Sequence, residues 1–140
     1  MLDCLVGSEM CIRDRLVGNL TVATHLLGTP HCPALTGRVL LLEDIGEAPY
    51  RIDRLLTHWR LSGALQQLAG LGFGRFEGCE APRDDTRPGF ELEQVLRERS
   101  CDLGIPVVGA LPFGHGQPNA AFPLGRTVRL DGSSGSLSVL

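Results

Sequence analysis

The amino-acid sequence predicts a single α/β domain. Its 140 residues include 18 glycines and nine prolines, which implies many tight connections between short elements rather than a helical bundle. Two apolar runs, 38–42 and 105–111, have the composition of buried strands. Apolar residues recur at helical spacing over 49–60 and 92–103. No internal repeat and no long linker divides the chain.

Composition and charge limit the classes of partner. The chain is 43% hydrophobic and 21% charged with a formal net charge of −3, an ordinary globular composition with enough apolar residues for a core. It has neither the basic surface nor the aromatic residues of a nucleic-acid binder, and no apolar run approaches the ~20 residues that span a bilayer. The five cysteines have no zinc-ligand spacing, so we expect free thiols and no metal site.

The first fifteen residues show neither a helical nor an alternating period and do not resemble a signal peptide. The codons ATG TGT ATA AGA GAC encode residues 10–14 and resemble the end of a transposase adapter used to prepare sequencing libraries. We therefore expect residues 1–15 to be an adapter-derived or disordered tail. In that case the native sequence is residues 16–140, which begin in the middle of a gene, and the N-terminal part of the natural protein is missing. The alternative is that residues 1–15 are a natural, poorly structured tail.

The native part begins with a short predicted helix. Gly18 and Asn19 form a plausible turn and cap, and the apolar residues that follow share one helix face. The sequence Gly28-Thr29-Pro30 is expected to end this helix.

The stretch 37–54, GRVLLLEDIGEAPYRIDR, organises the chain. A strand over 38–42 is followed at once by Glu43 and Asp44, and Pro49 stands where a helix would begin. A carboxylate at the end of an apolar strand is costly unless it is paired or used. The simpler alternative is that Glu43 only caps or solvates the turn.

The remaining elements follow in order. We expect a short helical piece at 64–68, a glycine-rich strand over 69–76, an exposed loop over 77–89 and an amphipathic helix over 92–103. The glycines of the strand do not match a dinucleotide-binding fingerprint, because no helix opens directly after them. After the strand at 105–111, a hairpin through Asp131-Gly132 is expected to pair 127–130 with 137–140.

Glu43 and His115 are the candidate catalytic residues. Each follows an apolar strand and is bracketed by turn residues, so neighbouring strands would bring both to one sheet edge. A carboxylate that accepts from one imidazole nitrogen leaves the other free to act as a base. No serine lies in a Gly-x-Ser-x-Gly elbow, so the nucleophile is missing; a thiol nucleophile at Cys79 or Cys101 is an alternative.

Four blocks resemble the C-terminal domain of the LD-carboxypeptidases, a family that includes the murein tetrapeptide carboxypeptidases and the microcin C immunity peptidases. They are Gly18-Asn19-Leu20, the stretch 37–54, a Gly-x-Phe-x-x-Cys segment at 74–79 and the segment 105–125. The resemblance covers 16–140. The chain departs from the family's pattern at two places. Val17 stands where the family often has a second glycine, and the loop at 81–87 is a few residues longer than the family's.

The resemblance implies a compact mixed β/α domain of the swivelling β/β/α type, the C-terminal half of a two-domain serine peptidase. It places the family's acid on Glu43 and its histidine on His115, with the serine in a missing N-terminal domain. The implied reaction releases a terminal D-alanine from murein tetrapeptide or a related peptide in the cytoplasm, without metal or organic cofactor. The chain alone would then be inactive.

Several points stay open at this stage. The sequence does not show which substrate side chain is preferred, or whether the role is murein recycling or immunity to a peptide antibiotic. It also leaves the oligomeric state open, and a homodimer is one possibility. The alternative function is a stand-alone, non-catalytic module that binds muropeptides.

Overall fold

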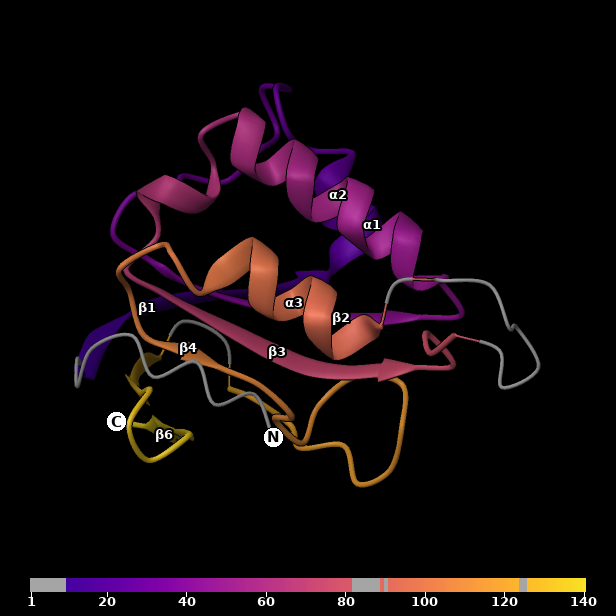
Figure 1. Ribbon diagram of the computed structural model, residues 1–140. Helices are drawn as coiled ribbons and strands as arrows, with labels where there is room; N and C mark the ends of the chain where they lie inside the picture. The colour runs from indigo at the N-terminus through magenta and orange to yellow at the C-terminus, as the bar shows by residue number, and fades with distance from the viewer. Residues whose placement is uncertain (1–9, 82–88, 90, 124–125) are drawn as a thin grey trace.

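The fold is a six-stranded mixed sheet with helices on one face, which confirms the predicted α/β class (Figure 1). The computed structural model describes residues 10–81, 89, 91–123 and 126–140. The strand order is β4-β3-β2-β1-β5-β6. β1 to β4 are parallel, whereas the hairpin β5–β6 adds antiparallel strands beside β1. The strands are β1 (Met10–Asn19), β2 (Val39–Ile45), β3 (Gly70–Glu77), β4 (Val107–Val108), β5 (Thr127–Asp131) and β6 (Ser136–Val139).

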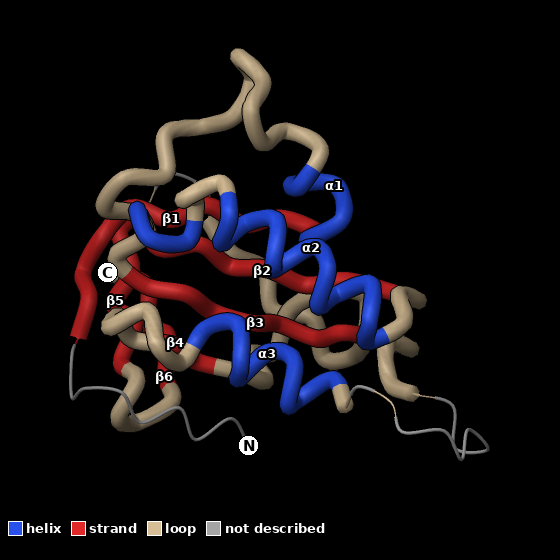
Figure 2. The backbone as a smooth tube through the Cα atoms, turned by 45° about the horizontal axis from the view of Figure 1, so that its top comes forward, coloured by secondary structure: helices blue, strands red, loops and turns tan. Residues whose placement is uncertain are grey.

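All described helices cover the same face of the sheet (Figure 2). They are α1 (Leu20–Thr24), α2 (Pro49–Leu61), the 3-10 turn η1 (Leu65–Gln67) and α3 (Leu92–Ser100). None of them is long and apolar enough to cross a membrane. α2 begins at Pro49 because proline fixes a helical φ and lacks only an N–H that the first turn would leave unbonded.

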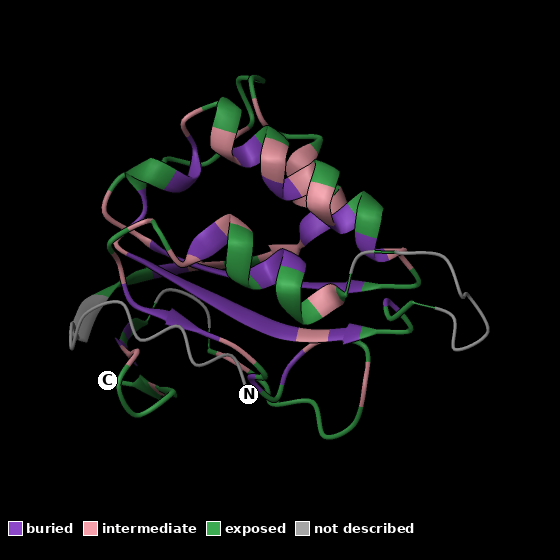
Figure 3. Ribbon diagram, in the orientation of Figure 1, coloured by how far each residue is buried: buried purple, intermediate pink, exposed green. Residues whose placement is uncertain are grey.

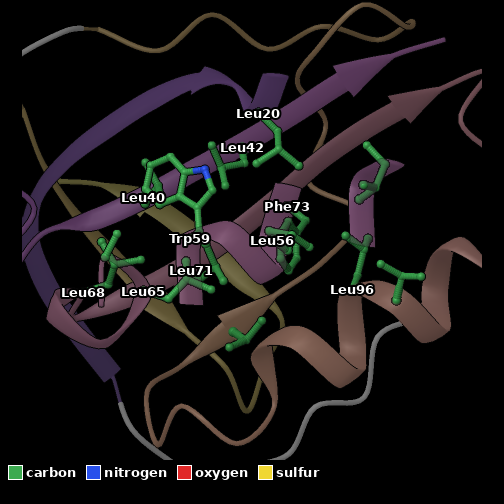
Figure 4. Packing of buried hydrophobic residues seen from close by; sticks show 14 of the residues in the cluster. Leu20, Leu40, Leu42, Leu56, Trp59, Leu65, Leu68, Leu71, Phe73 and Leu96 are labelled. Atoms are coloured by element: carbon green, nitrogen blue, oxygen red, sulfur yellow. The ribbon is translucent and has the colours of Figure 1, made fainter. Parts of the chain in front are cut away.

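The main core lies between these helices and the sheet (Figure 4). Leu56 and Trp59 of α2 point onto strand residues such as Leu42 and Leu71, all of them nearly inaccessible to solvent. The Trp59 indole N–H donates to Thr24 Oγ1 at 2.8 Å, which satisfies its polar atom and ties α2 to α1. Helix surfaces turned toward the sheet are accordingly buried and their outer surfaces exposed (Figure 3).

A second, smaller core lies on the opposite face of the sheet. Alternate residues of β2 divide between the two cores: Leu40 and Leu42 face the helices, while Val39 and Leu41 face the other way. The sheet curls so that β5 approaches the start of β3, where a Cβ on Gly70 would lie 2.9 Å from Leu130. The second core comprises Val39, Leu41, Val108, Leu111, Phe113, Val128 and Leu130.

Glycines on β3 allow the chain after β4 to lie directly against this strand. A Cβ on Gly72 would meet the side-chain ends of Leu41 and Leu111, whereas one on Gly74 would lie 2.7 Å from the carbonyl oxygen of Phe113. We expect Gly74→Ala to destabilise the fold by about 2–3 kcal/mol and Gly72→Ala by less, because side-chain ends yield more readily than a backbone. Urea unfolding measures both, and equal losses would contradict this explanation.

Several boundaries differ from those expected. β2 does not stop before Glu43 but continues to Ile45, and the expected strand at 105–111 keeps ladder pairing only at β4. The third helix ends at Ser100 instead of reaching Leu103. The segment expected to turn at Gly18-Asn19 is the end of β1, and α1 stops after Thr24, short of the glycine at 28.

Residues 10–15 belong to β1 rather than to a disordered tail. Their backbone pairs antiparallel with β5, from Met10 beside Asp131 to Asp14 beside Thr127. Arg15 is 6% exposed and donates to the carbonyl oxygen of Arg126 at 2.9 Å and to that of Pro123. Backbone pairing does not need a side-chain period, which is why no alternation marks this strand in the sequence. The adapter origin of 1–15 stays a prediction; residues 1–9 and most of the loop 77–89 lie outside the described part.

Candidate active site

Glu43 lies near the C-terminal end of β2 and is 7% exposed. Its side chain is on the same face of the sheet as that of Leu41, away from the helices. On one side its strand neighbour is Asn19, the last residue of β1. A buried carboxylate at this position needs a partner, since an uncompensated charge in the interior is strongly unfavourable.

His115 supplies that partner from the loop after β4. Its Nδ1 lies 2.7 Å from Glu43 Oε2, and about half of the imidazole side chain is exposed. β2 and β4, the strands that precede the two residues, are not neighbours as the sequence had suggested. β3 lies between them. The loop reaches Glu43 by passing over Gly74 of β3, where the Arg75 N–H donates to the Phe113 carbonyl oxygen at 2.8 Å.

The backbone at Gly114 makes this approach possible. Its φ is +118°, a value that favours glycine, and a Cβ there would lie 3.1 Å from Glu43 Oε2 and 3.1 Å from the Arg75 carbonyl oxygen. His115 therefore follows a residue that must be glycine for two reasons, conformation and space. The ring is held against the carboxylate while its other edge stays open to solvent.

The pair has the chemistry of an oriented general base. When the Nδ1–H donates to the Glu43 carboxylate, Nε2 carries a lone pair and can accept a proton from a hydroxyl. The same nitrogen, once protonated, can return the proton to a leaving amine. No three His, Cys, Asp or Glu side chains among the described residues gather as metal ligands.

Asp44, the next residue along β2, points to the helix side and is 2% exposed. Its carboxylate accepts from Asn19 Nδ2 at 2.9 Å and from the backbone N–H and hydroxyl of Thr21 at 2.9 and 2.8 Å. Asn19 Oδ1 in turn accepts from the Val22 N–H and caps α1, as its position before the helix predicted. Asp44 thus fixes the junction of β1 and α1 beside Glu43.

We expect Asp44→Ala to lower the free energy of unfolding by about 3 kcal/mol, because several buried donors lose their acceptor at once. Asp53→Ala is the matched control: its carboxylate pairs with Arg99 Nε at 2.6 Å near the surface, and its loss should cost at most about 1 kcal/mol. Urea unfolding of both variants tests this difference. A loss for Asp44→Ala no larger than that of the control would show that the network adds little.

Other charged residues of α2 and of its N-terminal turn form ion pairs within the fold. Glu47 pairs with Arg51 one helical turn away at 3.3 Å, and Asp53 of α2 reaches Arg99 of α3. A bidentate pair between Arg60 and Asp102 also links these helices, and the Arg60 guanidinium holds the pKa of the Asp102 carboxyl below its usual value. No sequence pattern predicted that pair, because Arg60 and Asp102 are 42 residues apart in the chain.

Neither Cys79 nor Cys101 offers an accessible thiol nucleophile at this site. Cys79 is fully buried, burial raises the pKa of its thiol, and its Sγ accepts from the Glu47 N–H at 3.4 Å. Cys101 is disulfide-bonded, so the expectation of free thiols is wrong for this residue, whereas Cys32 and Cys79 are free. The thiol alternative therefore has no support from the structure.

An apolar hollow lies elsewhere, on the helix side of β1. Val17, Val22 and Leu26 line it and are themselves exposed. The pair of Glu43 and His115 does not contribute to its lining. The hollow is accordingly separate from the polar site.

Comparison with known proteins shows the family of this chain. The sequence pattern of the family described as LD-carboxypeptidase C-terminal domain matches residues 14–130. A protein of Synechocystis sp. is 55% identical over 129 residues, which is 91% of this chain and 42% of that protein. The murein tetrapeptide carboxypeptidase of Pseudomonas aeruginosa is 36% identical over 135 residues, 92% of this chain and 41% of that enzyme.

Solved structures show the same fold. The crystal structure of muramoyltetrapeptide carboxypeptidase from Oxalobacter formigenes superposes with a TM-score of 0.81 at 32% identity, over 95% of this chain and 46% of that one. The microcin C7 self-immunity protein superposes with a TM-score of 0.78 at 23% identity, over 95% and 39% of the two chains, and shares the fold. The chain thus spans about two fifths of the length of the curated relatives described above.

Proposed function

Because this chain belongs to the LD-carboxypeptidase family, whose C-terminal domain it matches, we propose that it forms the C-terminal part of a serine-type carboxypeptidase. The proposed reaction is hydrolysis of the amide bond between an L-centre and a terminal D-alanine of murein tetrapeptide. The observation that carries the proposal is the 2.7 Å contact between His115 Nδ1 and Glu43 Oε2, the two residues on which the resemblance places the family's histidine and acid.

In this proposal the chain supplies the base and its orienting acid. His115 Nε2 takes the proton of a serine hydroxyl as the serine oxygen attacks the amide carbon, and Glu43 stabilises the imidazolium that results. His115 then gives the proton to the leaving amine of D-alanine, and an ester to the serine remains. Water, activated by the same nitrogen, hydrolyses that ester and restores the serine.

The serine would come from an N-terminal domain that is not part of these 140 residues. Two relatives support the substrate class, since one is named murein tetrapeptide carboxypeptidase and another muramoyltetrapeptide carboxypeptidase. A place in cytoplasmic murein recycling follows from that substrate as part of the proposal. The more distant likeness to a microcin C7 self-immunity protein supports only the fold.

A chimera tests the proposal. We expect this chain alone to release no D-alanine from murein tetrapeptide, because loss of a serine nucleophile costs roughly 10⁶ in turnover. Fusing residues 16–140 behind the N-terminal part of the Synechocystis relative should restore release at enzyme-like rates. The measurement is D-alanine formed from tetrapeptide by each protein at equal concentration.

Two results would count against the proposal. One is enzyme-like activity of the isolated chain, which would require a nucleophile within it. The other is a chimera that folds, as judged by cooperative unfolding, yet releases no D-alanine. The stand-alone binding module stays a prediction, and calorimetric titration of the chain with tetrapeptide tests it directly.

A further inference from the structure

A β-bulge in β3 lies directly beside the candidate site. In the pairing of β2 with β3, Leu42 lies beside Phe73 but Asp44 lies beside Phe76, so Gly74 and Arg75 together oppose Glu43. Such an extra residue bends the strand and changes the face to which the following side chain points. Here the bulge leaves Arg75 on the side of the sheet where the loop of His115 lies.

The Arg75 side chain lies along the residue that follows His115. A Cβ on Gly116 would be 2.9 Å from Arg75 Cδ and 3.3 Å from its Nη1. The side chain is partly exposed, and it makes no hydrogen bond or ion pair with any residue that the structure describes. By contrast, Arg51, the third residue of α2, is held by Glu47 and Tyr50.

The proposed reaction requires a group that binds an anion close to His115. The terminal carboxylate is attached to the carbon that bears the leaving amine, so its oxygens lie within about 4 Å of the nitrogen that His115 protonates. A guanidinium matches a carboxylate geometrically and can donate two hydrogen bonds to it. The Arg75 guanidinium lies against Gly116, the residue that follows His115, so it is placed beside the loop that a substrate carboxylate would approach.

We propose that Arg75 binds the terminal α-carboxylate of the substrate and thereby makes the site selective for the last residue of a peptide. This inference rests on the proposed function. It adds a specificity-determining residue that neither the match to the family nor the sequence pattern indicated. The sequence signal that could have suggested it is a lone arginine between two strand residues, which is weak by itself.

Glu77 gives the proposal a second, independent test. Its Oε2 would lie 2.8 Å from a Cβ on Gly116, so an anion is close to the same loop residue. A neighbouring negative charge opposes binding of another anion. Removal of the Glu77 charge should therefore strengthen carboxylate binding, whereas removal of the Arg75 charge should weaken it.

The experiment measures binding to the 140-residue chain by NMR titration with acetyl-L-alanyl-D-alanine and with its C-terminal amide. We expect the acid to bind on the order of tenfold more tightly than the amide and to shift the Arg75 side-chain Nε–H resonance. Arg75→Gln should abolish the preference for the acid, and Glu77→Gln should increase it roughly twofold. Arg51→Gln, the matched control, should leave it unchanged.

Three results would overturn the assignment of Arg75 as the carboxylate-binding residue. Equal binding of acid and amide by the unaltered chain, or no binding of the acid, would overturn the assignment. So would an acid preference that survives in Arg75→Gln, once dispersed amide spectra show that the variant is folded. Failure of the proposed function has a different signature, since it appears as an inactive chimera whatever the acid preference is.

Discussion

Replacing His115 by alanine in the active chimera is expected to lower kcat on the order of 10⁶-fold with little change in KM. The reason is that the imidazole is both the base for the serine hydroxyl and the acid for the leaving amine, so both half-reactions lose their proton carrier. The measurement is D-alanine release from tetrapeptide under saturating substrate. The variant should also lose about 1–3 kcal/mol of stability, because the Glu43 carboxylate is 7% exposed and loses its hydrogen-bond partner.

His58→Ala is the matched control. His58 is an exposed histidine in the last turn of α2, on the helix side of the sheet, and its removal should leave kcat within about twofold of the parent. A His115→Ala chimera that retains more than about a hundredth of the parent rate would argue that another group moves the proton. In that case the 2.7 Å pair would be a structural contact only.

The helices and strands that depend on local periodicity could be predicted from the sequence. The apolar spacing after Pro49 gave α2 almost to the residue, and the glycine-rich strand and the final hairpin were found for the same kind of reason. The ends of the strands were predicted less accurately. β2 continues through two acids because hydrogen-bonded partners on each face offset their burial, and those partners lie elsewhere in the chain.

The sequence suggested the two candidate residues, but not the path by which the chain brings them together. Glu43 and His115 are 72 residues apart, and the idea that they end adjacent strands was wrong. They meet because Gly74 lacks a Cβ and Gly114 has a positive φ, so the loop can cross β3 closely. The bulge that presents Arg75 depends on strand register, which a pattern of single residues does not encode.

Replacing Glu43 by glutamine is expected to lower kcat of the chimera about 10⁴-fold. The size and burial of the side chain are kept, but the amide can donate to Nδ1 as well as accept from it. The imidazole can then carry its proton on Nε2, the nitrogen that must be free to act as the base. Glu47→Gln, which alters only the partner of Arg51, should leave kcat nearly unchanged.

The tautomer itself can be observed in the isolated chain, without any nucleophile. In the unaltered chain at a pH where His115 is neutral, imidazole nitrogen resonances should place the proton on Nδ1, because Glu43 Oε2 is its acceptor at 2.7 Å. In Glu43→Gln the Nε2–H form should gain population. If the two chains had the same tautomer while kcat still fell, Glu43 would act by stabilising the imidazolium charge rather than by orienting the ring, and Glu43→Asp should then retain much of the activity.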